Sequence, residues 1–220
     1  MKTRVAILQG SLITFYTNFS IGYSWMVNGL CYYGLSLAAD DLGGSLYVNY
    51  VLAAVVEFPA VVLAIVCCDR FGRKKTVVYP TLVAGAACIA VAFIPTTGGI
   101  KAFRVFVGIF GKFCITLGFD SLYTWSVELY PTKIRAIGMG FLQVTARIGA
   151  ASSPWIAKGL KKVHHTLPFI VMGALTLVAG VTMFWLPETK GKVEGSEEED
   201  VAVSMKEIAG DQNVAYDAHE

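Results

Sequence analysis

The chain has 220 residues, of which 55% are apolar and 15% are charged, and its mean hydropathy is +0.58. A water-soluble domain is usually just under half apolar and about a quarter charged, so this composition indicates a membrane protein. The net charge of +2 comes from cations scattered over short loops, which argues against a nucleic-acid-binding patch.

Six stretches are long and apolar enough to cross a bilayer, which takes about 20 residues of helix. They are 12–38, 46–66, 76–95, 102–124, 136–156 and 167–186. The sequence therefore predicts an all-α, polytopic membrane helix bundle of six transmembrane helices over 12–186, with a cytoplasmic segment at 1–11. The basic start leads into an apolar stretch too long for a cleavable signal peptide, so we expect the spans themselves to direct insertion.

The distribution of Lys and Arg between the loops predicts the topology, because these residues accumulate on the cytoplasmic side. The face that holds both termini carries eleven of them, and the opposite face carries five. The eleven are Lys2, Arg4, Arg70, Arg73, Lys74, Lys75, Lys133, Arg135, Lys190, Lys192 and Lys206. We therefore expect both termini to be cytoplasmic in a multi-pass protein of the plasma membrane or the vacuolar membrane.

Aromatic and polar side chains share one face of the first span. Trp25, Asn28 and Tyr32 are spaced by helical turns and offer a surface for a quaternary ammonium, worth about 1–2 kcal/mol when desolvated. Aromatic residues also anchor helices at the membrane interface. We favour anchoring for Trp25 and a place in a cavity for Tyr32.

An ionisable residue inside a span is costly and is a functional candidate by default. In the second span, Glu57 precedes the kink expected at Pro59, where it can balance a cation or receive one. In the fourth span, Lys112 and Tyr123 are eleven residues apart and nearly eclipsed, with Asp120 about 80° from Lys112. Lys112 and Asp120 can thus form a pair or bracket a zwitterion.

The fifth span contains a cation, Arg147, on the same helical face as Gln143, Ala150 and Pro154. We expect that face to border a polar cavity. Whether Arg147 meets a substrate or makes a structural ion pair with Asp120 or Glu57 stays open at this point.

Two cytoplasmic loops carry ordered strings of residues. The first is Asp69-Arg70-Phe71-Gly72-Arg73-Lys74-Lys75, in which Gly72 permits a tight turn beside cations that can pair with acidic groups and helix ends. The second runs from Glu128 to Arg135 and contains the helix-ending Pro131. We expect Glu128 and Arg135 to reach the Asp69 loop in an ion pair, although an ordinary basic loop and a plain helix cap are the simpler alternatives.

The rest of the sequence offers no catalytic, cofactor or metal site. His164 and His165 adjoin lysines in an outer loop, and the five cysteines lack metal-ligand spacing and are expected to be buried thiols. No nucleophile triad, P-loop or dinucleotide fingerprint is present, so we expect no enzyme and no ATP hydrolysis. From 187 to 220 the chain holds the acidic run Glu197-Glu198-Glu199-Asp200, which predicts a disordered cytoplasmic tail.

Three strings after the second, fourth and sixth spans together resemble the major facilitator superfamily. They are the Asp69–Lys75 loop, Glu128-Leu129-Tyr130-Pro131-Thr132 with Arg135, and Pro187-Glu188-Thr189-Lys190-Gly191. Further strings are similar to the organic cation/carnitine transporter family, especially its plant-type members. They are Tyr32-Tyr33-Gly34-Leu35-Ser36-Leu37, Leu42-Gly43-Gly44, Glu57-Phe58-Pro59-Ala60 and Gly111-Lys112-Phe113. The resemblance covers about 25–191 and corresponds to the carboxy-terminal half.

The resemblance implies a transporter in which the substrate sits near the midplane between two six-helix halves that rock to alternate access. We expect one wall of the cavity to be lined by Arg147, Lys112, Tyr123, Glu57, Tyr32 and Asp120, of which Asp120 departs from the small or amide residue that the resemblance leads us to expect. The resemblance also implies a gate formed by Asp69, Arg70, Gly72, Arg73, Lys74, Glu128 and Arg135. Since relatives that handle carnitine or anions tend to have an arginine at the position of Arg147, the substrate is expected to bear a carboxylate.

Two other functions stay open. The chain can be a truncated, non-transporting membrane protein that modulates a full-length carrier, or it can be a proton-linked sugar transporter. The expected partners are a small organic ion, the lipid bilayer and an amino-terminal half or a full-length relative. Arg147 and Lys112 argue against the sugar carrier.

Overall fold

The computed structural model describes residues 2–38, 46–95, 100–130 and 134–186, all within one compact unit that spans Met1–Glu188. The described residues form six α-helices and no strand, which confirms the all-α fold class. The helices are α1 Lys2–Leu37, α2 Leu46–Phe71, α3 Arg73–Phe93, α4 Lys101–Leu129, α5 Arg135–Pro154 and α6 Leu167–Met183. The predicted acidic tail at 187–220 lies outside the described residues.

Each predicted span lies on one of these helices, and the helices extend beyond several of the predicted ends. The helix α1 begins at Lys2 rather than near residue 12, and α2 continues past residue 66 to Phe71. A predicted span covers only the apolar stretch of a helix, whereas the helix itself can continue into the aqueous layer. The ends of the span and of the helix therefore need not coincide. Pro59 lies inside α2 without ending it.

Three helices are long and apolar enough to cross a membrane by length and composition alone, among the described residues. They cover Tyr47–Phe71, Arg73–Phe93 and Ala102–Leu129, and α6 is apolar but shorter. Polar residues lower the apolarity of α1, where Ser20, Ser24 and Asn28 point inward and are buried. The helix α1 is therefore not among the three spanning candidates, and these three polar side chains of α1 are enclosed by the bundle.

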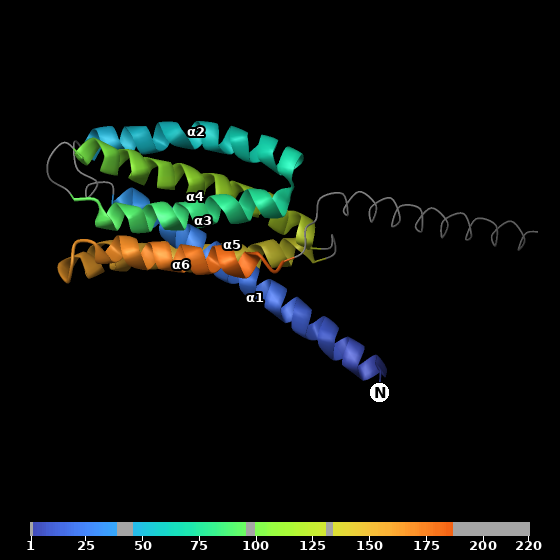
Figure 1. The fold of residues 1–220 in the computed structure, drawn as a ribbon. Helices are drawn as coiled ribbons and strands as arrows, with labels where there is room; N and C mark the ends of the chain where they lie inside the picture. The colour runs from blue at the N-terminus through green and yellow to red at the C-terminus, as the bar shows by residue number, and fades with distance from the viewer. Residues whose placement is uncertain (1, 39–45, 96–99, 131–133, 187–220) are drawn as a thin grey trace, which may run out of the picture. The chain divides into compact units, whose positions relative to one another are not determined.

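The packing order of the helices places α1, α4 and α5 around a common space. The closest pairs are α1 with α5, α3 with α4, and α3 with α6, while α2 packs mainly on α4. Figure 1 shows α2 and α6 on opposite sides of this unit with α3 between them. Although α4 and α5 are consecutive, they touch very little. A space is thus left between them on the face where α1 bridges the two.

Glycines bring α1 and α5 into backbone contact. A Cβ added at Gly29 of α1 would lie 2.5 Å from the carbonyl oxygen of Ala146, and one added at Gly149 of α5 would overlap the carbonyl oxygen of Met26. Small residues of this kind allow close helix packing in membranes. The register of α1 against α5 is therefore fixed at these two positions.

A single residue joins α2 to α3. Gly72 has a φ of 94°, a region that residues with a side chain rarely adopt, so glycine is what permits this sharp turn. After α5 the chain continues through a π-helical turn, Trp155–Gly159, and a 3₁₀ turn, Leu160–Lys162, before α6 begins.

The cysteines are free thiols, as expected from their spacing. Cys31, Cys68, Cys88 and Cys114 are buried and Cys67 is half-buried. The Sγ atom of Cys31 lies 2.8 Å from Oγ1 of Thr176, which joins α1 to α6. The thiols thus pack as small side chains of the core.

Candidate functional site

A buried ion pair joins α2 and α4 inside the bundle. Nζ of Lys112 lies 3.1 Å from Oε1 of Glu57 and donates to Oγ of Ser36 at 3.0 Å and to the carbonyl oxygen of Tyr32 at 3.1 Å. The hydroxyl of Tyr32 donates to the Glu57 carboxylate at 2.9 Å. The Lys112 ammonium also lies 3.1 Å from the centre of the Tyr32 ring. Hydrogen bonds with Tyr32 and Ser36 of α1 therefore stabilise both the Lys112 ammonium and the Glu57 carboxylate.

The two members of this pair differ in access. The Lys112 side chain is 4% exposed, whereas that of Glu57 is 31% exposed. Removing one partner of a buried pair leaves an uncompensated charge, which is far more costly than the pair itself. Lys112 thus neutralises the charge of Glu57 from the buried side of the pair. Glu57 and Tyr32 are partly exposed side chains of this cluster.

A polar pocket lies where α1, α4 and α5 meet. Its volume is about 270 Å³, and its lining residues are Gly29, Tyr33, Phe119, Asp120, Tyr123, Gln143, Ala146 and Arg147. Nη1 of Arg147 donates to the Tyr33 hydroxyl at 3.4 Å, and Nε2 of Gln143 donates to the Tyr123 hydroxyl at 2.7 Å. Side chains from three helices thus converge on this space.

Charges of opposite sign stand on different helices of the pocket. Asp120 comes from α4 and Arg147 from α5, and no ion pair joins them among the described residues. Oδ2 of Asp120 is buried and has no hydrogen-bond partner in that part of the chain. Since buried polar atoms are nearly always paired, this oxygen makes Asp120 a candidate for contact with a cationic or hydrogen-bonding group.

The buried ring of Trp25 packs against two aromatic rings that line the pocket. The ring of Trp25 lies 5.0 Å from that of Tyr123 and 5.5 Å, edge-on, from that of Phe119. Its Nε1 donates to Oγ of Ser126 at 2.8 Å. Our preference for Trp25 as an interfacial anchor is wrong, because this side chain is fully buried in the core and holds two rings of the pocket in place.

The sequence-predicted cavity residues fall into two neighbouring groups. Tyr32, Glu57 and Lys112 form the ion-pair cluster, while Asp120, Tyr123 and Arg147 line the pocket. Tyr32 and Tyr33 are adjacent residues whose rings meet edge-to-face at 5.2 Å, so they connect the groups. Lys112 pairs with Glu57 and not with Asp120, and Arg147 pairs with neither acid in the described chain.

Two residues of the site, Tyr33 and Ser36, make hydrogen bonds that the sequence did not predict. Tyr33 is the hydrogen-bond partner of Arg147, and Ser36 accepts a hydrogen bond from Lys112. Ser36 lies one helical turn after Tyr32 and shares its face of α1. The expected place of Tyr32 in a cavity could therefore have predicted the same for Ser36. The position of Tyr33 depends on how α5 crosses α1, which local spacing does not reveal.

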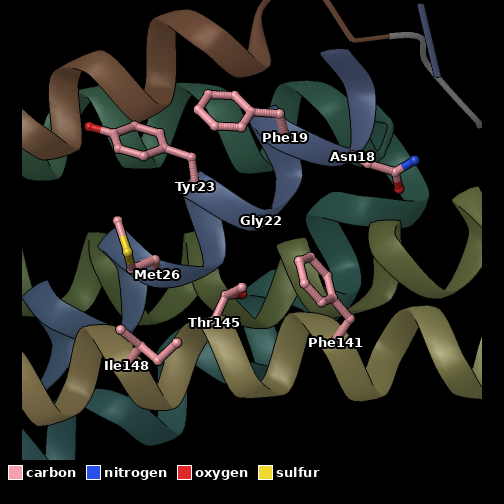
Figure 2. Close-up of a pocket in the computed structure, with 8 residues that line it drawn as sticks. All are labelled: Asn18, Phe19, Gly22, Tyr23, Met26, Phe141, Thr145 and Ile148. Atoms are coloured by element: carbon pink, nitrogen blue, oxygen red, sulfur yellow. The ribbon is translucent and has the colours of Figure 1, made fainter. Parts of the chain in front are cut away.

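A second pocket, also between α1 and α5, is almost entirely apolar. Figure 2 shows the side chains of α1 and α5 around it, and its volume is about 280 Å³. Asn18, Phe19, Gly22, Tyr23, Met26, Phe141, Thr145 and Ile148 line it. No charged residue is among them, so this space is a poor candidate for binding an ion.

Three of the predicted gate residues, Asp69, Arg73 and Glu128, meet at the ends of three helices. Nε of Arg73, at the start of α3, lies 2.8 Å from Oε1 of Glu128 near the end of α4, and its Nη1 lies 4.0 Å from Oδ1 of Asp69. Nζ of Lys74 lies 5.4 Å from the centre of the Phe184 ring. Arg135 instead donates to the carbonyl oxygen of Tyr130 at 3.2 Å, within its own loop. Whether these contacts act as a gate stays a prediction.

A tyrosine secures the carboxy-terminal end of α4 to α1. The hydroxyl of Tyr130 donates to Oδ1 of Asn18 at 2.7 Å. Burial raises the pKa of Tyr130 above its ordinary value, so the hydroxyl keeps its proton and remains a donor at neutral pH.

Comparison with known proteins identifies the family of this fold and site. The family model for the Major Facilitator Superfamily matches residues 8–215. The chain belongs to the major facilitator superfamily. It is therefore an integral multi-pass membrane protein of a transporter family, not an enzyme.

Two of three similar proteins in the comparison are organic-ion transporters by name. Solute carrier family 22 member 2 of Homo sapiens is 35% identical over 170 residues, 77% of this chain and 30% of the relative. The Organic cation transporter protein of Drosophila melanogaster is 35% identical over 172 residues, 78% of this chain and 31% of the relative. Organic anion transporter 3 of Pongo abelii is 33% identical over 171 residues, 78% of this chain and 31% of the relative. The chain thus matches less than a third of the length of each.

Proposed function

We propose that this chain forms one half of the substrate pathway of a carrier that moves small organic ions, cations or zwitterions such as carnitine, by alternating access. The observation that carries the proposal is the pocket between α1, α4 and α5, in which Arg147 and the unpartnered carboxylate of Asp120 stand on different helices. The resemblance to plant-type organic cation/carnitine transporters and the names of the relatives support the same substrate class.

Each charged group has a distinct role in this proposal. Arg147 receives an anionic group, for which the planar guanidinium is well suited, and the Tyr33 hydroxyl orients it. Asp120 receives the cationic group, and the rings of Tyr123 and Phe119 offer cation–π surface to a quaternary ammonium. Glu57 and Tyr32 form the neighbouring wall, which Lys112 keeps neutral.

A second half is needed to close the cavity. The pocket is bounded by helices of this unit only, and the chain matches less than a third of each named relative. In the proposed carrier a further six spans face α1, α4 and α5, and the contact between Arg73 and Glu128 closes the cytoplasmic side in one of the two states.

Uptake of labelled carnitine into proteoliposomes tests the proposal. The vesicles hold the chain alone or the chain with a separately made amino-terminal segment of the Drosophila relative. Uptake above that of empty vesicles, lost in Arg147→Ala and in Arg147→Asp, supports it. If correctly inserted chain gives no uptake of carnitine or of a simple organic cation in either setting, transport is refuted.

A modulator of a full-length carrier is the second candidate. It predicts that the chain alters the uptake rate of a co-expressed full-length relative while giving none by itself. The proton-linked sugar carrier finds no support in the site, since a neutral sugar gives no partner of matching charge to Arg147 or Asp120.

A further inference from the structure

A third pocket lies on the outer surface of the unit, near the cytoplasmic ends of α2 and α3. Its volume is about 250 Å³, and Phe71 of α2, Tyr79 and Pro80 of α3 and Leu117 of α4 form its apolar walls. Phe71 and Tyr79 are 63% and 57% exposed. Because α2 and α3 are two of the helices able to span a membrane, these exposed apolar walls face hydrocarbon.

One end of this groove is cationic. Lys75 lines it directly and is exposed, and it makes no ion pair with any acidic residue of the described chain. The same loop contributes Arg70, Arg73 and Lys74, and Arg73 is paired with Glu128 and lies 4.0 Å from Asp69. The groove therefore joins a positively charged mouth to an apolar floor.

The backbone adds to the positive potential at the mouth. The helix α3 is 21 residues long and begins at Arg73, two residues before Lys75. The first N–H groups of a helix have no intrahelical acceptor, and the positive end of its dipole attracts anions. Thr76, which also lines the groove, already bonds back to the carbonyl oxygen of Gly72. An anion beside Lys75 thus meets both a cation and the helix end.

We propose that this groove is a binding site for an anionic phospholipid of the cytoplasmic leaflet, with the headgroup phosphate at Lys75 and an acyl chain along Phe71, Tyr79, Pro80 and Leu117. Basic pockets between membrane helices on the cytoplasmic side bind acidic lipid headgroups. The loop carries the largest cluster of cations in the sequence, and the positive-inside rule places it in that leaflet. This site shares no lining residue with the organic-ion pocket, and its mouth adjoins the proposed gate contact of Arg73.

Native mass spectrometry of the detergent-purified full chain tests the site. Dioleoyl phosphatidylserine is expected to bind at least about fivefold more tightly than dioleoyl phosphatidylcholine, the effect of roughly one added cation at a membrane surface. Lys75→Gln should bring the two lipids close to parity, and Lys75→Arg should restore the preference. Lys162→Gln, which removes an exposed cation from the opposite loop, should leave the preference unchanged. Tyr79→Ser should weaken both lipids by removing one groove wall.

Four results would overturn the assignment. The first is equal binding of the two lipids to the parent chain, and the second is a full preference retained in Lys75→Gln. The third is binding of glycerophosphoserine, which has no acyl chains, or of inorganic phosphate as tight as that of the lipid, since the groove would then be irrelevant. The fourth is a chain dimer in place of lipid adducts, lost in Tyr79→Ser, which would make the groove a contact between two copies.

Discussion

The ion pair between Lys112 and Glu57 shows how one residue's role depends on its neighbours. Each residue alone is a costly charge in an apolar span, and together with Tyr32 and Ser36 they form a compensated unit. The pair is therefore expected to behave as a unit when it is mutated, and not as two independent ligands.

Single and double substitutions of this pair have different expected costs. Lys112→Met leaves the Glu57 carboxylate without its cation and should cost about 3–5 kcal/mol of stability, whereas Lys112→Met with Glu57→Gln should recover most of that loss. Thermal unfolding of the purified variants measures both, with the exposed Lys162→Met as control. A double variant no more stable than Lys112→Met would show that the two charges do not compensate each other.

The sequence predicted which residues would be special but not always what they would touch. Arg147, Asp120 and Glu57 stood out because charges are rare in apolar spans, and the structure places Arg147 and Asp120 in the lining of the polar pocket and Glu57 in the ion pair with Lys112. The partners of Arg147 and Lys112 could not be predicted, since they depend on the crossing of α1 over α4 and α5. Trp25 was misassigned for the same reason, because helical spacing gives a face but not the neighbour it meets.

At the scale of whole helices, the apolar runs located the six helices, but several of the helix ends lie beyond the predicted ones. Gly72 and the basic loop mark the junction of α2 and α3, and Pro154 lies at the end of α5. The full length of α1 did not follow, because Thr14, Tyr16, Thr17 and Asn18 interrupt the apolar pattern while the helix continues through them. Local sequence patterns did not predict which helices pack together, above all the close contact of α1 with α5.

That contact predicts an unusual sensitivity to a single methyl group. Gly149→Ala places a Cβ against the carbonyl oxygen of Met26, so α1 and α5 must separate, at a cost of about 3 kcal/mol, the upper end of usual overpacking costs. Because Gly29 and Ala146 line the polar pocket, ligand binding should weaken as well. Thermal unfolding of Gly149→Ala measures the loss of stability, and titration with labelled carnitine measures the loss of binding.

The matched control for this substitution lies on the same helix. Gly140 has open space at its Cβ position, so Gly140→Ala should leave stability unchanged or raise it by up to about 1 kcal/mol. Equal behaviour of the two variants would contradict the proposed role of the close contact.

At the scale of the molecule, the unit resembles a wall and not a closed container. Its two charged groups, the ion-pair cluster and the pocket, lie side by side along α1, joined by Tyr32 and Tyr33. In carriers of the major facilitator superfamily two halves enclose a central site, and the proposed function makes this unit one of those halves. The proposed function therefore depends most directly on whether this wall recognises an organic ion.

Equilibrium binding of labelled carnitine and labelled choline to the purified full chain tests that claim most directly. We predict saturable carnitine binding that Arg147→Ala weakens at least about tenfold, the loss of one charge-assisted contact, while choline binding persists. Asp120→Asn should weaken both ligands, and Lys158→Ala, which removes an exposed cation elsewhere, should weaken neither. Carnitine binding unchanged in Arg147→Ala, or absent from a parent chain that unfolds cooperatively, would contradict the account.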